Sequence, residues 1–494
     1  MTQQIQRRSF LAAGAAVVGA FGVGTAQASF VKAPQKWDVS TDILVIGSGG
    51  AGLAAAVSAK EAGAKNVLLI EKLSFVGGNT MIASGFYNCV DPVRQKKSNV
   101  EDSIEKHFQQ TIAGGDYRGD PVLVRQLVEQ AYPTLQWLES HGMKFKDTVF
   151  QVYGALWPRS HTPLEAKGNG YIRVLKQACD KLGVTIQTDT KLVQFIREEP
   201  QGGKLLGVLV DQEGEKKYIR AKAVVLATGG FASNPTLRGL HDQRLVNIST
   251  TNNPACSTGE GLIAANEAGA YLVGMDYIQC NPGKPVGKKY RGVLHNEVSR
   301  YIMINKKAVR FINEDARRDV IRDAILAQPD RLAFSVVDDD GLHTQDHIVI
   351  ETIEKMLKEG EAWKANSFEE LGQKMGLDPK VFKKTVEEYN AITKTGKDPM
   401  GKAPRNASHA IIKPPFWACY SAISAHHTMG GVRINKDTQV IDLNGKVIPA
   451  FYAAGEVTGG IHGTNRLGGN AIADIFVHGR IAGARAAAYA AKNA

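Results

Sequence analysis

A glycine-rich turn near the N-terminus restricts the fold of this chain more than any other feature. Residues 43–46 are all apolar, which is typical of a parallel strand buried on both faces, and residues 47–52 follow with the pattern G-x-G-x-x-G. Residues 53–62 favour a helix, and residues 66–70 form a second apolar run. A strand, a glycine turn, a helix and a second strand in this order predict a Rossmann-like α/β unit that binds a dinucleotide.

Each position of the turn has a physical role in such a unit. Gly47 permits the tight turn, Gly49 leaves room for a pyrophosphate beside the backbone, and Gly52 lets the helix pack closely on the strand. The helix N-terminus stabilises the phosphates, and Glu71 accepts hydrogen bonds from a ribose hydroxyl, which disfavours NADP. The residues predicted to bind the cofactor here are Gly47, Gly49, Gly50, Ala51, Gly52, Glu71 and Lys72.

Further glycine-rich segments indicate which dinucleotide is bound. GGNT at 77–80 follows the second strand, AVVLATGG at 223–230 reads as a buried strand ending in a glycine pair, and FYAAGEVTGG at 451–460 comes late in the chain. This is the layout of flavoproteins with two dinucleotide folds, in which the chain returns to FAD at its end. The additional residues predicted to bind FAD are Gly78, Asn79, Thr80, Ser84, Gly85, Thr228, Gly229, Gly230, Gly455, Glu456, Asn470, Ala471 and Ile472.

Residues 1–28 are predicted to be an export signal. Arg7 and Arg8 precede a short apolar run, and Ala26-Gln27-Ala28 supplies small residues for cleavage. The run is too short to span the ~30 Å of a bilayer core as a helix. The Arg7-Arg8 pair favours a twin-arginine signal over an ordinary Sec signal, and therefore a periplasmic protein with no integral membrane segment in its mature chain.

Charge and cysteine content exclude some functions. The net charge of +11 suggests nucleic acid or a membrane surface as a partner, but the sequence contains no nucleic-acid-binding motif. A basic entrance to the substrate site, which attracts anionic carboxylates, explains the charge more simply. The five cysteines are widely spaced, without a CxxC or CxxCH motif, so neither a zinc site nor a c-type haem is expected. Each cysteine is predicted to be a small buried residue.

Four segments together carry a resemblance to a known family. GGNT at 77–80, ATGGF at 227–231, HHTMGG at 426–431 and AAGEVTGGIHGTNRLGGNAI at 453–472 resemble the soluble fumarate reductase flavoproteins, the flavocytochrome c group. The resemblance extends over about residues 37–490. It implies an α/β fold in which a Rossmann-like FAD-binding domain is interrupted by a smaller α+β clamp domain. The implied divisions are 1–28 (signal), 29–277 and 426–494 (FAD-binding domain), and 278–425 (clamp).

The resemblance also concerns the cofactor and the electron donor. Membrane-bound relatives attach FAD through a His after the second strand, and residues 72–89 contain none, so non-covalent FAD is expected. Haem-carrying relatives place cytochrome motifs before the flavin fold, and here only the signal and a short leader are expected there. A separate donor, such as a periplasmic c-type cytochrome, would therefore supply the electrons in anaerobic respiration.

The implied reaction reduces the C=C bond of an α,β-unsaturated carboxylate. Arg466 and His426 match the residues that bind the substrate carboxylate, and His427 is left without a role. Hydride passes from the flavin N5 to the β-carbon, and Arg318 matches the residue that protonates the α-carbon, with Asp319 behind it. An arginine does not give up a proton readily, so the role requires a relay. Glu297 and Arg300 match that relay.

Departures from the family affect the choice of substrate. Asn281 and Asn296 stand where haem-bearing relatives use a His and a Thr for the second carboxylate, and a basic loop with Lys284, Lys288, Lys289 and Arg291 lies between them. The two asparagines can bond a carboxylate or face a neutral or aromatic group, so fumarate, urocanate, acrylate, methacrylate, cinnamate and itaconate all stay candidates. Tyr290 and Tyr301 either stack on an aromatic substrate or are loop and core residues.

Two other functions are weighed against this one. An FAD-dependent dehydrogenase or oxidase, such as a ketosteroid dehydrogenase, uses a tyrosine pair and does not need Arg318 or Arg466. A flavin electron carrier without a substrate would have no use for the candidate set of His426, Arg466, Arg318, Glu297 and Arg300. The arginines and histidines therefore favour the reductase.

Overall fold

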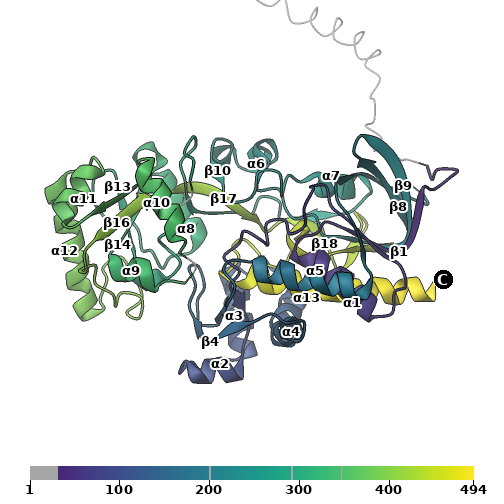
Figure 1. The fold of residues 1–494 in the computed structure, drawn as a ribbon, viewed down its shortest axis with the longest axis horizontal. Helices are drawn as coiled ribbons and strands as arrows, with labels where there is room; N and C mark the ends of the chain where they lie inside the picture. Colours follow the sequence, from purple (N-terminus) through teal and green to yellow (C-terminus); the bar gives the residue numbers. More distant parts are fainter. Residues whose placement is uncertain (1–31, 200–201, 291–292, 347, 494) are drawn as a thin grey trace, which may run out of the picture.

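The structure is a computed structural model that describes residues 32–199, 202–290, 293–346 and 348–493. The predicted export signal and Arg291 lie outside the described residues. Two lobes lie side by side along the longest axis, with the N- and C-terminal parts of the described chain in the same lobe (Figure 1). Among the described residues, no helix combines the length and the apolar character that crossing a bilayer requires.

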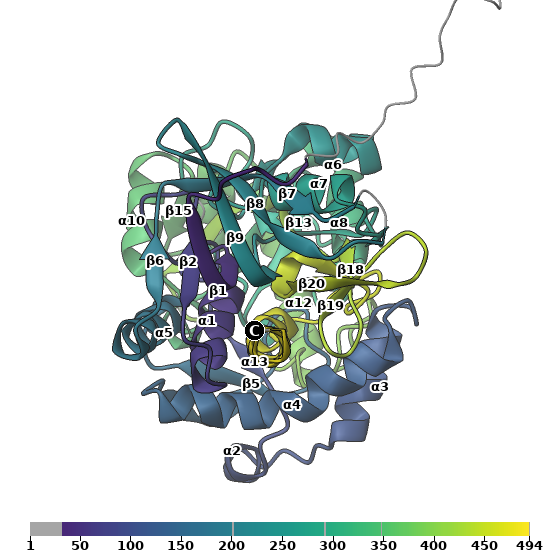
Figure 2. The same ribbon diagram turned by 90° about the vertical axis from the view of Figure 1, so that its right-hand side faces the viewer.

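The larger lobe is built on an eight-stranded sheet that contains the predicted Rossmann unit. Its central strands are parallel, and the first strand lies between the second strand and the strand that carries the ATGG motif (Figure 2). The strand order is β19 (Gln439–Ile441), β20 (Val447–Ala453), β9 (Glu215–Leu226), β1 (Val39–Ile46), β2 (Val67–Ile70) and β6 (Thr185–Gln187), with β8 (Leu205–Gln212) and β7 (Thr190–Arg197) attached through β9.

The two ends of the described chain meet beside this sheet. α1 (Gly50–Glu61), which follows the glycine turn, packs against α13 (Asn470–Lys492), and both lie below the sheet in Figure 2. Glycines at the contact allow the close approach: a Cβ at Gly479 would lie 2.6 Å from the Ala51 carbonyl oxygen, and one at Gly483 would lie 2.0 Å from that of Ala55. The late segment therefore returns to the glycine turn, as the sequence predicts.

The remaining elements of this lobe surround the sheet. A three-stranded antiparallel sheet and four helices precede β6, and short strands and helices follow β9. Their bounds are α2 (Pro92–Lys97), α3 (Ile104–Gly114), α4 (Pro121–Ser140), α5 (Asn169–Leu182), α6 (Pro235–His241), α7 (Glu260–Glu267), β3 (Tyr87–Asn88), β4 (Phe145–Phe150), β5 (Ser160–Pro163), β10 (Ser249–Thr250), β11 (Leu272–Val273), β18 (Gly431–Arg433) and β21 (Thr458–Gly459).

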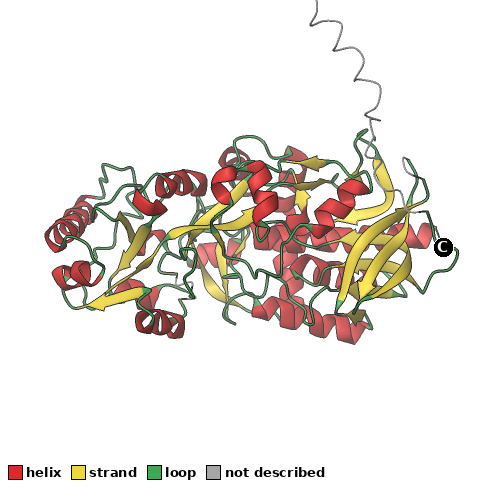
Figure 3. Ribbon diagram, turned by 90° about the horizontal axis from the view of Figure 1, so that it is seen from above, coloured by secondary structure: helices red, strands yellow, loops and turns green. Residues whose placement is uncertain are grey.

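The smaller lobe has its own sheet and its own apolar core. Four antiparallel strands pack Ile304, Phe334 and Phe416 against Phe382 and Tyr389 of a helix, and the helices cover the sheet from outside (Figure 3). The elements are β13 (Ile302–Asn305), β14 (Ala333–Val337), β15 (Ala362–Ala365), β16 (Phe416–Tyr420), α8 (Arg318–Leu326), α9 (Asp339–Thr344), α10 (Ile350–Lys358), α11 (Phe368–Lys374) and α12 (Pro379–Thr395). The α/β class is confirmed, and the domain limits at 277/278 and 425/426 stay a prediction.

Two antiparallel strands run between the lobes. β12 (Ile278–Gly283) leads into the smaller lobe, and β17 (Ala422–Thr428) leads out of it. They pair with each other, and β17 also pairs with β10 of the larger lobe. The side chains of this strand pair therefore lie at the junction of the two lobes.

Candidate active site

The first cavity of interest lies at the carboxyl ends of β1 and β2 and at the N-terminus of α1. This is where open parallel sheets bind their ligands. Most of the residues predicted to bind FAD line it: Gly47, Gly49, Gly50, Ala51, Glu71, Lys72, Gly78, Asn79, Thr80, Thr228, Gly229 and Glu456. We call this space the cofactor cavity.

The glycines of the turn differ in what they make possible. Gly47 has φ +101°, a conformation that favours glycine, and so serves the turn itself. A Cβ at Gly52 would lie 1.8 Å from the Gly47 carbonyl oxygen, so Gly52 serves helix packing. A Cβ at Gly49 would meet nothing nearer than Thr80 Oγ1 at 3.9 Å, so the space beside Gly49 is open to a ligand.

Polar groups in the cofactor cavity suit a dinucleotide. The Glu71 carboxylate is fixed at the end of β2, because Oε2 accepts hydrogen bonds from Ser48 N (2.9 Å) and Ser48 Oγ (2.6 Å), and Oε1 accepts one from Leu73 N (3.0 Å). The buried Thr228 hydroxyl has no hydrogen-bond partner among the described residues. A buried unpaired hydroxyl is costly and indicates a polar ligand. The cavity therefore fits FAD.

Other residues predicted to bind FAD support the cavity from behind. A Cβ at Gly230 would lie 1.9 Å from Thr428 Oγ1, and one at Gly455 would lie 2.9 Å from Ala51 Cβ. The Asn470 side chain accepts hydrogen bonds from Asn88 and donates one to Thr111. Gly52, Gly230, Gly455 and Asn470 therefore act through packing, whereas Ser84, Gly85, Ala471 and Ile472 line a second cavity.

The second cavity adjoins the first and shares Asn79, Thr80 and Glu456 with it. It encloses about 180 Å³ at the junction of the two lobes. The predicted substrate residues Asn281, Asn296, His426 and Arg466 line it together with the predicted proton donor, Arg318. We call this space the substrate cavity.

Two buried arginines from distant parts of the chain converge in the substrate cavity. Arg318 begins α8, and Arg466 lies in the loop before α13. Arg318 Nη1 and Arg466 Nη2 donate to the same oxygen, Gln279 Oε1, at 2.9 Å and 2.8 Å. Both side chains therefore point to one end of the cavity.

Neither of these guanidinium groups has an ion-pair partner within the described chain. Their other bonds are to the carbonyl oxygens of Tyr153 (2.7 Å) and Leu467 (3.1 Å), and both Nε atoms are buried without an acceptor in the described part of the chain. Burial lowers the pKa of Arg318, and burial together with the neighbouring Arg318 charge lowers that of Arg466 well below its usual value. Two buried cations without an ion-pair partner among the described residues indicate a site for an anion.

A β-bulge places two histidines in the same cavity. Gln279 lies opposite His427, and Cys280 lies opposite Ala425, so His426 is an extra residue in β17. Because a bulge breaks the alternation of a strand, both His426 and His427 line the cavity. Thr251 Oγ1 lies 2.6 Å from His426 Nδ1 and orients that ring.

Glu456 lies between the two cavities. Burial raises the pKa of the Glu456 carboxyl to about 7, against the opposing effects of hydrogen bonds from Thr428 and the charge of Arg466. Burial, followed by the charge of Arg466, lowers the pKa of the adjacent His427 well below its ordinary value, so this ring is neutral. His427 Nδ1 lies 3.7 Å from Glu456 Oε2.

The predicted relay residues lie apart from the substrate cavity. Glu297 and Arg300 flank a single turn of 3₁₀ helix, with 3.4 Å between Glu297 Oε1 and Arg300 Nε. No hydrogen bond or ion pair joins either of them to Arg318 in the described structure. Asp319 also differs from the expectation, because its carboxylate binds the guanidinium of Arg317.

Sequence reasoning missed two residues that hold Arg318. Gln279 joins both arginines, and the ring of Tyr153 lies 5.0 Å from the Arg318 guanidinium carbon, within the range of a cation–π contact. The signal for Gln279 was its position two residues before Asn281, since alternate residues of a strand share a face. No local signal marks Tyr153.

The tyrosines and the basic loop discussed above lie elsewhere. Tyr301 is a core residue, and Tyr290 packs against the core. Lys289 pairs with Glu359, and none of the described lysines of this loop lines the substrate cavity. All five cysteines are buried, as predicted, and each is a free thiol in the structure.

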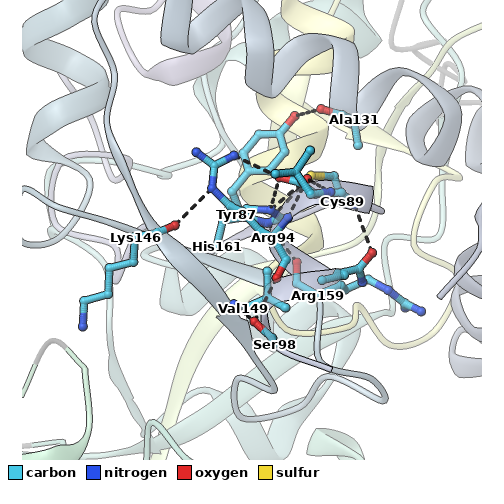
Figure 4. A network of polar contacts seen from close by, with 12 residues as sticks. Tyr87, Cys89, Arg94, Ser98, Ala131, Lys146, Val149, Arg159 and His161 are labelled. Atoms are coloured by element: carbon cyan, nitrogen blue, oxygen red, sulfur yellow. Dashed lines mark hydrogen bonds and ion pairs between the residues drawn. The ribbon is translucent and has the colours of Figure 1, made fainter. Parts of the chain in front are cut away.

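A Cys–His–Asp cluster outside both cavities is part of the core. His161 Nε2 lies 3.1 Å from Asp91 Oδ2, and Cys89 Sγ lies 3.7 Å from His161 Nδ1 (Figure 4). All three side chains are fully buried, and burial raises the pKa of the Cys89 thiol well above its usual value. Because thiol reactivity requires an accessible thiolate, this cluster is structural.

Comparisons with known proteins agree with this geometry. The FAD binding domain family matches residues 42–472. The fumarate reductase (cytochrome) of Shewanella frigidimarina is 37% identical over 94% of this chain and 80% of its own length. The urocanate reductase of Eggerthella lenta is 36% identical over 93% of this chain and 76% of its own length. The acrylate reductase flavoprotein subunit of Shewanella woodyi is 34% identical over 90% of this chain and 91% of its own length.

Solved structures give the same result. The open conformation of a flavocytochrome c3 fumarate reductase is similar with a TM-score of 0.75 at 36% identity, covering 92% of this chain and 79% of that one. A 3-ketosteroid-Δ4-(5α)-dehydrogenase from Rhodococcus jostii RHA1 has a TM-score of 0.72 at 26% identity, and the match covers 92% of this chain and 98% of that one.

The fold, the cofactor cavity and the buried arginine pair define an FAD-dependent oxidoreductase. The chain belongs to the FAD binding domain family and, within it, groups with the fumarate reductase flavoproteins, which confirms the resemblance seen in the sequence.

Proposed function

We propose that the protein reduces the C=C bond of an α,β-unsaturated carboxylate. The observation that carries the proposal is the pair of buried, unpaired guanidinium groups of Arg318 and Arg466 next to the cofactor cavity. A substrate carboxylate would supply the missing negative charge, and the cations would stabilise the enolate-like charge that develops during reduction. The similarity to fumarate, urocanate and acrylate reductases supports the same class of reaction.

The residues of the substrate cavity have separate roles in the proposed reaction. Arg466 and His426 bind the carboxylate and hold the substrate against the cofactor. FAD, when bound, supplies the hydride that goes to the β-carbon. Arg318 protonates the α-carbon, and burial favours this role because it lowers the pKa of the guanidinium. Gln279 and the Tyr153 carbonyl keep the Arg318 side chain pointed at the same place as Arg466.

Reprotonation of Arg318 is proposed to use Glu297 and Arg300. Their ion pair lies at the 3₁₀ turn that directly follows Asn296, whose carbonyl oxygen accepts a hydrogen bond from Tyr153 N at 3.0 Å. Since Tyr153 also binds Arg318, the two groups are held by neighbouring backbone.

The cellular setting is proposed from the sequence. The twin-arginine pattern supports a periplasmic protein, and the absence of CxxCH supports a separate electron donor such as a c-type cytochrome. No histidine lines the cofactor cavity among the described residues, which supports non-covalent FAD.

A dehydrogenase of the ketosteroid type is the other candidate that the fold allows. Such enzymes need a pair of tyrosines at the reacting carbons. Tyr153 is the one tyrosine among the described residues that line the substrate cavity. The two arginines therefore favour the reductase.

The proposal is tested with reduced methyl viologen as donor and fumarate, urocanate, acrylate, methacrylate, cinnamate and itaconate as acceptors. Arg318→Ala should lower kcat by about 10²- to 10⁴-fold, the usual effect of losing a proton donor, with FAD still bound. Arg322→Ala, one turn further along α8, is the matched control and should keep its activity. A near wild-type rate for Arg318→Ala would show that the proton comes from another group.

A further inference from the structure

The substrate cavity has positive charge at one end only. Arg318 and Arg466 meet at Gln279 Oε1, and among the described lining residues no other Lys or Arg occurs. Asn281 and Asn296 also line the cavity, and both are neutral and buried. A substrate therefore meets cations with one end and uncharged amides with the other.

Asn281 lies within reach of a substrate held by the arginines. It stands two residues after Gln279 in β12, which places it roughly 6 Å along the strand. A four-carbon enoate bound by Arg466 has a length of this order. The Asn281 Oδ1 atom is buried and has no hydrogen-bond partner among the residues that the structure describes. A buried acceptor without a donor indicates that a ligand supplies one.

Asn296 is held in place by a backbone contact. One N–H of its Nδ2 group donates to the Asp346 carbonyl oxygen at 2.8 Å. The amide oxygen, which accepts hydrogen bonds, and the second N–H remain for a ligand. Asp346 is itself held by the larger lobe, because its carboxylate bonds Thr162 Oγ1 at 2.9 Å and pairs with Lys146. Asn296 is therefore a fixed, neutral amide.

We propose that the far end of the substrate is an uncharged group that donates a hydrogen bond to Asn281. The inference rests on the proposed function and names its substrate class: a monocarboxylate enoate whose second substituent carries an N–H or O–H group. A second carboxylate in this position would be buried beside neutral amides, without a Lys or Arg among the described lining residues at this end, and would leave Asn281 Oδ1 without a donor. A carboxamide both donates to Asn281 Oδ1 and accepts from its amide nitrogen.

Three acceptors of nearly equal shape test this assignment in the FAD-loaded enzyme with reduced methyl viologen. Fumarate carries a second carboxylate, its monoamide carries a neutral donor, and its monomethyl ester is neutral without a donor. We expect kcat/KM for the monoamide to exceed that for fumarate and for the ester by about tenfold or more, since one unpaired buried polar group costs that much. A kcat/KM for fumarate equal to or above that of the monoamide overturns the assignment.

Two variants locate the effect at Asn281. Asn281→Leu should bring kcat/KM for the monoamide down to the level of the ester and leave the ester nearly unchanged. Asn281→His introduces a cation at this end and should raise kcat/KM for fumarate relative to the monoamide. An unchanged preference in both variants overturns the role of Asn281.

Failure of this inference is distinguishable from failure of the proposed function. If the wild-type enzyme reduces fumarate better than its monoamide, the class of reaction stands and the assignment of the far end is wrong. If FAD-loaded wild-type enzyme reduces none of the enoates, the proposed function is wrong, and the substrate class falls with it.

Discussion

The cofactor cavity and the substrate cavity share a wall but are built in different ways. The cofactor cavity is lined largely by backbone, much of it from the single segment that contains Gly47, Gly49 and Gly50. The substrate cavity is lined by side chains that come from separate segments, including Arg318 and Arg466. Backbone sites depend on small residues and stabilise the fold, whereas the side-chain site contains buried charges that cost stability until an anion binds.

The largest effect expected from this difference is at Arg466. Arg466→Met removes a buried cation that has no ion-pair partner among the described residues, so it should raise the free energy of unfolding by about 1 to 4 kcal/mol. It should also lower kcat/KM by about 10²- to 10³-fold, because a charge-stabilising group is lost. Urea unfolding and steady-state kinetics measure the two effects, and FAD should still bind.

Arg238 is the matched control for this substitution. It is also buried and has no ion pair with any described residue, but its guanidinium donates to the carbonyl oxygens of Ala232, Leu245, Val246 and Ile248. Arg238→Met should therefore destabilise the protein. Equal losses of stability in both variants would contradict the contrast between the two cavities.

A smaller effect is expected at Gly49. Its Cβ position is open and its backbone has φ −66°, so Gly49→Ala should leave the melting temperature of the FAD-free protein unchanged. The added methyl group should clash with the pyrophosphate and weaken FAD binding by about ten- to a hundredfold, equivalent to about 1 to 3 kcal/mol of overpacking. Flavin fluorescence titration measures this affinity, and an unchanged affinity would show that phosphate does not approach Gly49.

The smallest effect concerns Glu456 and the pH. Burial raises its pKa to about 7 from 4.5, so the folded state holds the proton more tightly than the unfolded state does. This contribution to stability is complete below about pH 4.5, is lost as the pH rises to about 7, and then stays lost. In Glu456→Gln, urea unfolding of the FAD-free protein should lack this decline, which is on the order of 2 kcal/mol. The same decline in both proteins would mean that another group causes it.

The sequence allowed the cofactor cavity to be predicted because its determinants are local. The order of strand, glycine turn and helix fixes where the helix N-terminus lies, and the structure places Gly47, Gly49 and Glu71 there. Gly230 and Gly455 were also predicted to bind FAD, and in the structure the position of a Cβ at each is occupied by a neighbouring side chain, Thr428 and Ala51 respectively. A glycine motif does not distinguish a position that faces a ligand from one that faces another strand.

The substrate cavity was predicted in part, through the resemblance of single motifs. Arg318, His426 and Arg466 converge as expected. Gln279 was missed because its contacts join residues 39 and 187 positions away, which no local pattern reveals. His427 was left without a role because simple alternation puts neighbours on opposite faces, and only the bulge in β17 brings both histidines together.

The packing of α13 on α1 has a consequence for how the protein is made. The turn that holds the phosphates emerges early from the ribosome, but Ile475 of α13, which closes the same cavity, is translated only after the whole smaller lobe. During synthesis, the face of α1 that packs against α13 therefore stays uncovered until α13 has been translated. We therefore expect tight flavin binding only after α13 has been made, because Ile475 completes the lining of the cofactor cavity.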